Sequence, residues 1–181
     1  MGALTILLII IAVIAVMAIG IYNSLIQLRN RCENSWAQVD VQLKRRYDLI
    51  PNLVETVKGY ATHEKEVFLK VTEARTSAMN AGTVKDQGMA ENQLSGALKT
   101  LFAVAESYPD LKANKNFIEL QNELVELEDH LQYARRFYNG SVRVLNTRIE
   151  TVPDMIVAQL FRFRPADFFA AENRDAPTVK L

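Results

Sequence analysis

Residues 3–22 read ALTILLIIIAVIAVMAIGIY and contain no charged side chain. An α-helix rises about 1.5 Å per residue, so about 20 apolar residues in a helix cross the roughly 30 Å hydrocarbon core of a bilayer. We therefore predict a transmembrane anchor over residues 1–22. Tyr22 at the end of this stretch fits an aromatic residue at the membrane interface.

Three alternatives to a spanning helix are less consistent with the sequence. A cleaved signal peptide begins with positive charge and has a shorter apolar run, whereas no Lys or Arg precedes this run. A lipoprotein signal needs a cysteine directly after the run, and the single cysteine, Cys32, comes only after Arg29 and Arg31. A buried core helix of this length is rarely needed in so short a chain. An uncleaved anchor is the favoured interpretation.

The positive charges beside the anchor predict its orientation. No Lys or Arg lies before the span, while Arg29 and Arg31 follow it closely. Because cytoplasmic flanks carry the excess of Lys and Arg, we expect a single-pass protein with the rest of the chain in the cytoplasm. An extracytoplasmic domain remains the alternative.

Composition limits the partners and the size of the domain. The 21 Lys and Arg residues balance 21 Asp and Glu residues, so no overall positive field favours a nucleic-acid partner. A chain of 181 residues is expected to form one domain beyond the anchor.

Apolar residues after the anchor recur at spacings of three and four, the pattern of an amphipathic helix. Pro51 is expected to kink or restart the first helix, and Pro109 to end the third. The fourth helix is predicted to run from Phe117 to Pro153 with a coiled-coil-like repeat, and Asn116 is its predicted N-cap. The sequence thus predicts an all-α fold, in which a transmembrane helix continues into an elongated antiparallel four-helix bundle over residues 23–153.

The last segment, residues 154–181, is rich in phenylalanine. Two roles are open for this tail: a strap folded back on the bundle, or a docking segment for another subunit or the membrane surface. Its candidate interaction residues are Phe161, Phe163, Phe168 and Phe169.

Motifs for catalysis, cofactors and metal ions are missing from the sequence. The stretch His63-Glu64-Lys65-Glu66 lacks the second histidine of a zinc-protease helix. The sequence shows no glycine-rich phosphate loop and no paired Glu-x-x-His motif of a di-iron bundle. We therefore expect no catalytic, cofactor-binding or metal-binding residues.

Two basic clusters and the polar residues beside Pro51 are further candidates for interaction. The basic side chains either pair with acidic faces of neighbouring helices or contact anionic lipid or an acidic partner. The polar residues beside Pro51 either satisfy backbone groups that the proline leaves free or form a recognition patch. They are Arg45, Arg46, Asp48, Asn52, Arg135 and Arg136.

Residues 36–61, WAQVDVQLKRRYDLIPNLVETVKGYA, resemble the signature of the LemA family, as do ESYPDLKAN at 106–114 and ARRFYN at 134–139. This resemblance implies a membrane-attached helical bundle of bacterial type. It implies no established enzymatic activity and supplies no catalytic residue.

The sequence and the resemblance together predict a non-catalytic, single-pass, membrane-anchored scaffold or adaptor at the bacterial envelope that assembles with copies of itself. Expected partners are the lipid bilayer, further copies and a membrane-associated protein. Two alternatives remain open: a regulatory partner of a membrane protease and a metal-binding bundle enzyme.

Overall fold

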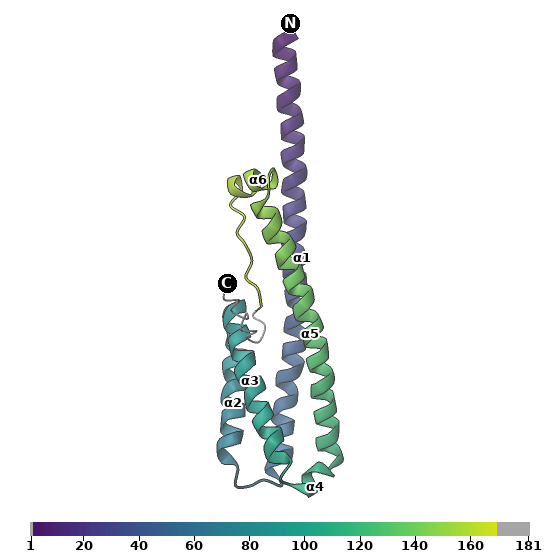
Figure 1. Cartoon of the computed structure of the whole chain (residues 1–181), viewed down its shortest axis with the longest axis vertical. Helices are drawn as coiled ribbons and strands as arrows, with labels where there is room; N and C mark the ends of the chain where they lie inside the picture. Colours follow the sequence, from purple (N-terminus) through teal and green to yellow (C-terminus); the bar gives the residue numbers. More distant parts are fainter. Residues whose placement is uncertain (1, 170–181) are drawn as a thin grey trace, which may run out of the picture. The chain divides into compact units, whose positions relative to one another are not determined.

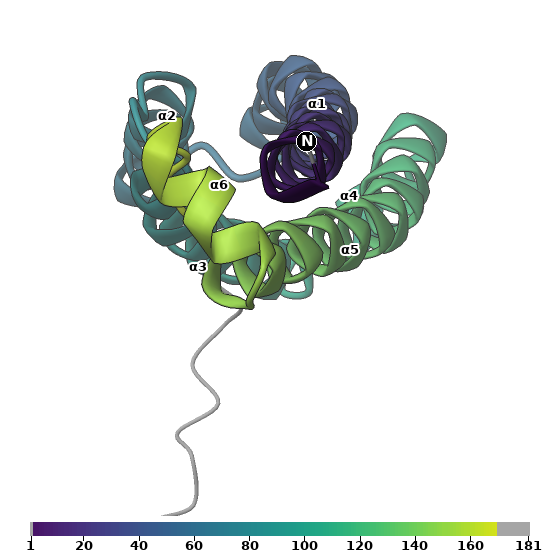
Figure 2. The ribbon, with the colours of Figure 1, turned by 90° about the horizontal axis from the view of Figure 1, so that it is seen from above.

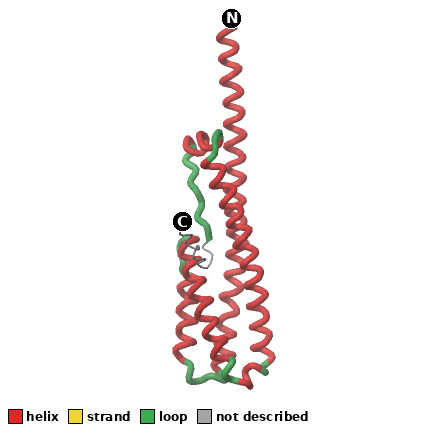
Figure 3. The backbone as a smooth tube through the Cα atoms, viewed as in Figure 1, coloured by secondary structure: helices red, strands yellow, loops and turns green. Residues whose placement is uncertain are grey.

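A computed structural model describes residues 2–169. Within this range the chain contains helices and no strand, which confirms the predicted all-α class (Figure 3). The helices are α1 (Gly2–Lys58), α2 (Lys65–Met79), α3 (Val84–Ala105), α4 (Pro109–Lys112), α5 (Lys115–Glu150) and α6 (Asp154–Leu160), labelled in Figure 1.

The described residues form two compact units. The anchor unit consists of residues 2–37 and 136–167, and the core unit of residues 38–135 and 168–169. The helices α1 and α5 contribute to both units. The bounds 1–22, 23–153 and 154–181, and a single four-helix bundle over residues 23–153, stay predictions.

The beginning of α1 is apolar and exposed. From residue 2 to residue 17 every described side chain is solvent-exposed, although most of these side chains are aliphatic. Among the described residues, α1 is the one helix long and apolar enough to cross a membrane. Because such a surface is costly to leave in water, the helix indicates membrane association, in agreement with the predicted anchor.

Pro51 does not restart the helix. The helix α1 continues through this residue and ends at Lys58, and α2 begins only at Lys65. Pro51 has no N–H to donate to the carbonyl of Tyr47 four residues earlier, and Arg75 of α2 donates its Nε–H to that carbonyl at 2.8 Å. Of the two predicted effects of Pro51, the restart is therefore wrong, because a neighbouring helix satisfies the carbonyl that the proline leaves free. The kink stays a prediction.

The start of α5 also differs from the prediction. The side-chain Oδ1 of Asn114 accepts a hydrogen bond from the backbone N–H of Phe117 at 3.1 Å. Asn116 already lies inside α5, so Asn114 is the capping residue. The end of α5 at Glu150, before Pro153, confirms that this long helix stops ahead of the proline.

The core unit contains segments of α1, α2, α3 and α5, and α2 and α3 lie side by side (Figures 1 and 3). The apolar stripes of these helices account for its buried side chains. They include Leu43, Ile50, Leu53, Val57, Phe68, Val71, Leu94, Leu101, Leu124 and Leu131.

The segment after α5 turns into the short helix α6, which the sequence analysis missed. Arg148 of α5 pairs with Asp154 at the start of α6, with 2.6 Å between Nη1 and Oδ2. Beyond α6 the backbone of Ala166 exchanges two hydrogen bonds with Asn146 of α5, at 2.9 and 3.0 Å. Residues 161–167 therefore form a strap within the anchor unit, which is the first of the two roles predicted for the tail. The part of the tail from residue 170 onward lies outside the described residues.

Candidate functional site

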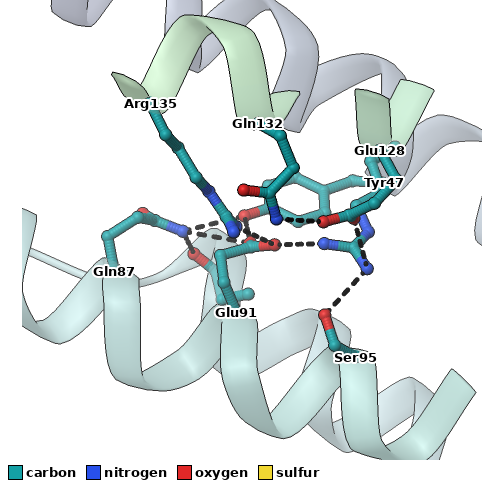
Figure 4. A network of polar contacts seen from close by, with 9 residues as sticks. Tyr47, Gln87, Glu91, Ser95, Glu128, Gln132 and Arg135 are labelled. Atoms are coloured by element: carbon teal, nitrogen blue, oxygen red, sulfur yellow. Dashed lines mark hydrogen bonds and ion pairs between the residues drawn. The ribbon is translucent and has the colours of Figure 1, made fainter. Parts of the chain in front are cut away.

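A buried carboxylate lies at the centre of a polar network in the core unit (Figure 4). The side chain of Glu91 in α3 is 0% exposed. Its Oε2 accepts a hydrogen bond from Arg46 Nη1 at 2.9 Å, and its Oε1 accepts one from the hydroxyl of Tyr47. Arg135 Nη2 lies 3.9 Å from the same Oε2. Side chains from α1 and α5 thus contact the same carboxylate, that of Glu91 on α3.

A second set of contacts completes the network. Gln87 donates from Nε2 to the hydroxyl oxygen of Tyr47 at 2.8 Å. Arg46 Nη2 donates to Ser95 Oγ at 3.0 Å and lies 3.3 Å from an oxygen of Glu128. The polar groups around the buried charge therefore have partners within the same unit.

Helical spacing explains why charged residues are buried here. Arg46 continues the α1 stripe between Leu43 and Ile50, at steps of three and four residues. Glu91 precedes Leu94 on the equivalent stripe of α3. Removing such charges from water costs several kcal/mol per ion, and this cost is offset only where the ions pair closely.

The charges of this network balance, because two arginines, Arg46 and Arg135, lie beside two carboxylates, Glu91 and Glu128. Burial, followed by the hydrogen bond to the Glu91 carboxylate, raises the pKa of the Tyr47 phenol far above its ordinary value. The phenol therefore remains protonated and donates a hydrogen bond throughout the physiological range. With both oxygens of Glu91 engaged, the network holds three helices together.

An open cavity of about 340 Å³ lies beside the network, within the core unit. Its lining combines apolar side chains with charged and polar ones, as at many protein-docking surfaces. The residues that line it are Arg46, Asn92, Ser95, Leu98, Lys99, Phe102, Leu124, Val125, Glu128, Gln132 and Arg135.

Two of the predicted interaction residues come together at this site. Arg46 and Arg135 are far apart in the chain, yet both lie next to Glu91. The guanidinium carbon of Arg135 also lies 4.6 Å from the ring centroid of Phe169, which is buried.

The other predicted polar residues lie elsewhere. Arg45 and Asp48 are exposed and line a separate, shallow cavity of about 370 Å³ in the core unit. Asn52 is exposed, and its carbonyl accepts the hydroxyl of Thr56 at 2.8 Å. Arg136 is exposed in the anchor unit.

The phenylalanines of the tail fall into two groups. The rings of Phe161 and Phe163 lie with their centroids 4.7 and 5.8 Å from that of Tyr22 in the anchor unit. In the core unit Phe168 is exposed and Phe169 is buried.

Sequence analysis missed Glu91, Gln87 and Tyr47, although a signal for two of them was present. Gln87 and Glu91 extend the apolar stripe of α3 backwards at the helical spacing. A polar residue at a stripe position is a candidate for a buried, paired side chain.

Within residues 2–169, no group of three or more His, Cys, Asp or Glu side chains is arranged to hold a metal ion. His63 is exposed, and the exposed His130 lies 3.7 Å from Glu126 on the same helix.

Comparisons with known proteins agree with these features. The model of the LemA family matches residues 35–181, so the chain belongs to the LemA family. Protein LemA of Metamycoplasma hominis is 27% identical over 90% of this chain and 76% of its own length. Magnetosome protein MamQ 2 of Paramagnetospirillum magneticum is 25% identical over 87% of this chain and 68% of its own length. Magnetosome protein MamQ of Magnetospirillum gryphiswaldense is 22% identical over 82% of this chain and 64% of its own length.

Proposed function

We propose that this LemA-family chain is a non-catalytic, single-pass, membrane-anchored scaffold of the bacterial envelope that assembles with copies of itself. The observation that carries the proposal is the continuity of α1. One helix, Gly2–Lys58, begins as an exposed apolar segment and ends as a buried part of the core unit. Between Gly2 and Lys58 the helix itself has no break.

The polar network supports a structural role over a catalytic one. Glu91 is enclosed, and its oxygens are held by Arg46 and Tyr47. A catalytic acid or base needs access to a substrate, whereas a buried, paired carboxylate holds helices in a defined register. The relatives named magnetosome proteins are named for a cellular structure and not for a reaction, which also favours a scaffold.

Exposed apolar side chains on α5 are the proposed self-association surface. Val125 and Tyr133 in the core unit are 60% and 67% exposed. Val125 also lines the cavity of about 340 Å³ in the core unit. Anchoring raises the local concentration of copies in the plane of the membrane, so a modest surface is sufficient for assembly.

Light scattering on the detergent-solubilised full chain at micromolar concentration tests this proposal. We expect the wild type to run as an oligomer, and Val125→Glu with Tyr133→Glu to shift it to a monomer. The matched control is Asn116→Glu with Asn122→Glu, which adds the same charge at exposed positions of α5. A monomeric wild type, or equal dissociation by both pairs, would contradict the proposal.

Point variants give a cleaner test than removal of the tail. Deleting residues 161–181 is also expected to weaken the oligomer. That deletion, however, removes the strap bonded to Asn146 and the buried Phe169. A loss of assembly would then be confounded by a loss of folding.

A further inference from the structure

A second cavity, of about 340 Å³, lies within the anchor unit beside the apolar part of α1. Arg29 of α1 and Arg162 and Arg164 of the strap supply its charged groups, and no Asp or Glu is among the described residues that line it. Its remaining wall is apolar and aromatic. Three guanidinium groups around one opening favour an anion, because their planar N–H groups match phosphate oxygens in pairs.

The position of the cavity along α1 identifies the source of that anion. Tyr22 directly follows the exposed apolar segment, and its ring packs against Phe161, with 4.7 Å between the centroids. Arg29 lies one to two turns further on, about 10 Å along the helix axis. The polar layer on each side of the hydrocarbon core is roughly 5–8 Å thick, and long arginine side chains extend toward it. A cavity between Tyr22 and Arg29 is therefore within reach of lipid headgroups.

The short helix α6 carries an apolar face at the same level. Ile156, Leu160 and Phe161 are 62%, 74% and 53% exposed, whereas Val157 and Ala158 are buried. Figures 1 and 2 show α6 lying across the direction of the N-terminal part of α1, within the anchor unit. A helix in this orientation runs parallel to the membrane that α1 crosses. Its exposed apolar residues are those of an interfacial helix.

Arg162 has a left-handed backbone conformation that is unusual for a residue with a side chain. The N–H of Phe163 bonds to the carbonyl of Ala158 at 2.9 Å, and Arg162 has a φ of 58°. This is the geometry of a Schellman cap, where glycine is the usual residue because it has no Cβ to strain. An arginine occupies this strained position, and it is one of the residues that line the cavity.

We propose that the cavity binds the phosphate of an anionic phospholipid, with Arg29, Arg162 and Arg164 as its ligands and α6 lying in the interface. The inference rests on the proposed membrane anchoring. Arg29 lies 3.7 Å from Glu33, but both side chains are more than half exposed, so this ion pair is weak. A lipid phosphate competes with it readily.

Native mass spectrometry of the detergent-solubilised full chain tests this inference with phosphatidylglycerol and phosphatidylcholine in equal amounts. We expect phosphatidylglycerol to bind several-fold more often than phosphatidylcholine. The change Arg162→Gly is the sharpest variant, because it removes a guanidinium and relieves the strained backbone. It is expected to bring the lipid ratio near one while the unfolding temperature stays the same or rises.

Controls separate the site from charge in general and from free phosphate. Replacing Lys65, Lys70 and Lys85 with Gln removes three exposed charges of the core unit and is expected to leave the lipid ratio unchanged. Excess inorganic phosphate is expected to displace little of the bound lipid. If the control variant loses selectivity as Arg162→Gly does, or if inorganic phosphate displaces the lipid fully, the inference is overturned.

A second measurement tests whether α6 lies in the membrane interface. With Trp36→Phe as background, a tryptophan at Ile156 is expected to be quenched by brominated phospholipids in vesicles, and a tryptophan at Val125 much less. Equal quenching at both positions overturns the interfacial placement. A chain that stays in salt-washed membranes yet shows no lipid preference disproves this inference alone, whereas a chain released by salt disproves the anchoring itself.

Discussion

The Nε–H of Arg75 donates a hydrogen bond to the backbone carbonyl of Tyr47 at 2.8 Å. This carbonyl would bond to the N–H of residue 51 in a regular helix, but residue 51 is proline. One side chain of α2 thus replaces the missing helical bond, and α1 passes through Pro51 to Lys58.

The replacement of one hydrogen-bond donor by another can be tested by removing the Arg75 side chain with and without a backbone N–H at residue 51. Arg75→Ala is expected to lower the free energy of unfolding by about 1–3 kcal/mol, because the carbonyl loses its partner. In the Pro51→Ala background the same change is expected to cost less, since the new backbone N–H reaches the carbonyl. Denaturant unfolding followed by circular dichroism measures both, with exposed Lys70→Ala as the control. If the changes in unfolding free energy of Arg75→Ala and Pro51→Ala simply added in the double variant, the two donors would not compete for the Tyr47 carbonyl.

Removing one charge of the buried network is predicted to be far more costly than removing one at its edge. Glu91→Gln leaves Arg46 without its buried counter-ion and is expected to cost about 3–5 kcal/mol of unfolding free energy. Glu128→Gln removes a carboxylate whose side chain is 35% exposed, and we expect a loss of about 1 kcal/mol or less.

The double variant Arg46→Met with Glu91→Leu separates the cost of an unpaired buried charge from the contribution of side-chain packing to stability. Replacing both ions with apolar residues is expected to recover most of the stability that Glu91→Gln alone removes. Equal losses from Glu91→Gln and Glu128→Gln in denaturant unfolding would show that burial does not dominate the network.

Alkaline pH is expected to weaken the strap. Burial raises the pKa of the Tyr138 phenol to about 12, and its hydroxyl donates to the Asp167 carbonyl at 2.8 Å. A pKa raised in the folded state gives stability that is complete below the unfolded value of about 10 and is lost as the pH rises through about 12. The gap in unfolding free energy between wild type and Tyr138→Phe should narrow by roughly 1 kcal/mol from about pH 9 to about pH 11. A difference in unfolding free energy that stays constant over this pH range would argue against the raised pKa of Tyr138.

The strap is also expected to open when its anchor on α5 is removed. Asn146 accepts from the Ala166 N–H at 2.9 Å and donates to the Ala166 carbonyl at 3.0 Å. Asn146→Ala should therefore speed trypsin cleavage after Arg162, measured by mass spectrometry of the fragments. The neighbouring exposed Thr147→Ala should leave the cleavage rate unchanged.

Local patterns account for the parts of the fold that could be predicted. The uncharged run at residues 3–22 and the three-and-four spacing depend only on neighbouring residues, so a first helix apolar enough to cross a membrane and the all-α class follow directly. The long α5 before Pro153 was predicted for the same reason. The wrong N-cap at Asn116 arose because Asn114 offers the same chemistry two residues earlier.

Contacts distant in the chain could not be predicted in this way. Arg46 and Glu91 are 45 residues apart, and Arg75 and Tyr47 are 28 apart. Arg46 and Glu91 lie on the apolar stripes of their helices, which is a local signal for a buried position, but no local pattern identifies the partner of either residue. Packing of the helices decides which of them become buried and which partner each one meets.

The sequence by itself determined that this chain is helical, that its first helix is apolar enough to cross a membrane, and which helix faces are apolar. These properties arise from hydrophobicity and from the helical period, both of which act within a few residues. Only the tertiary structure decided that α1 passes through Pro51, that Glu91 is enclosed between two arginines, and that three further arginines line one cavity beside Tyr22. Those outcomes depend on which surfaces meet in space, because a charge is stable in a buried position only where a partner from another segment reaches it.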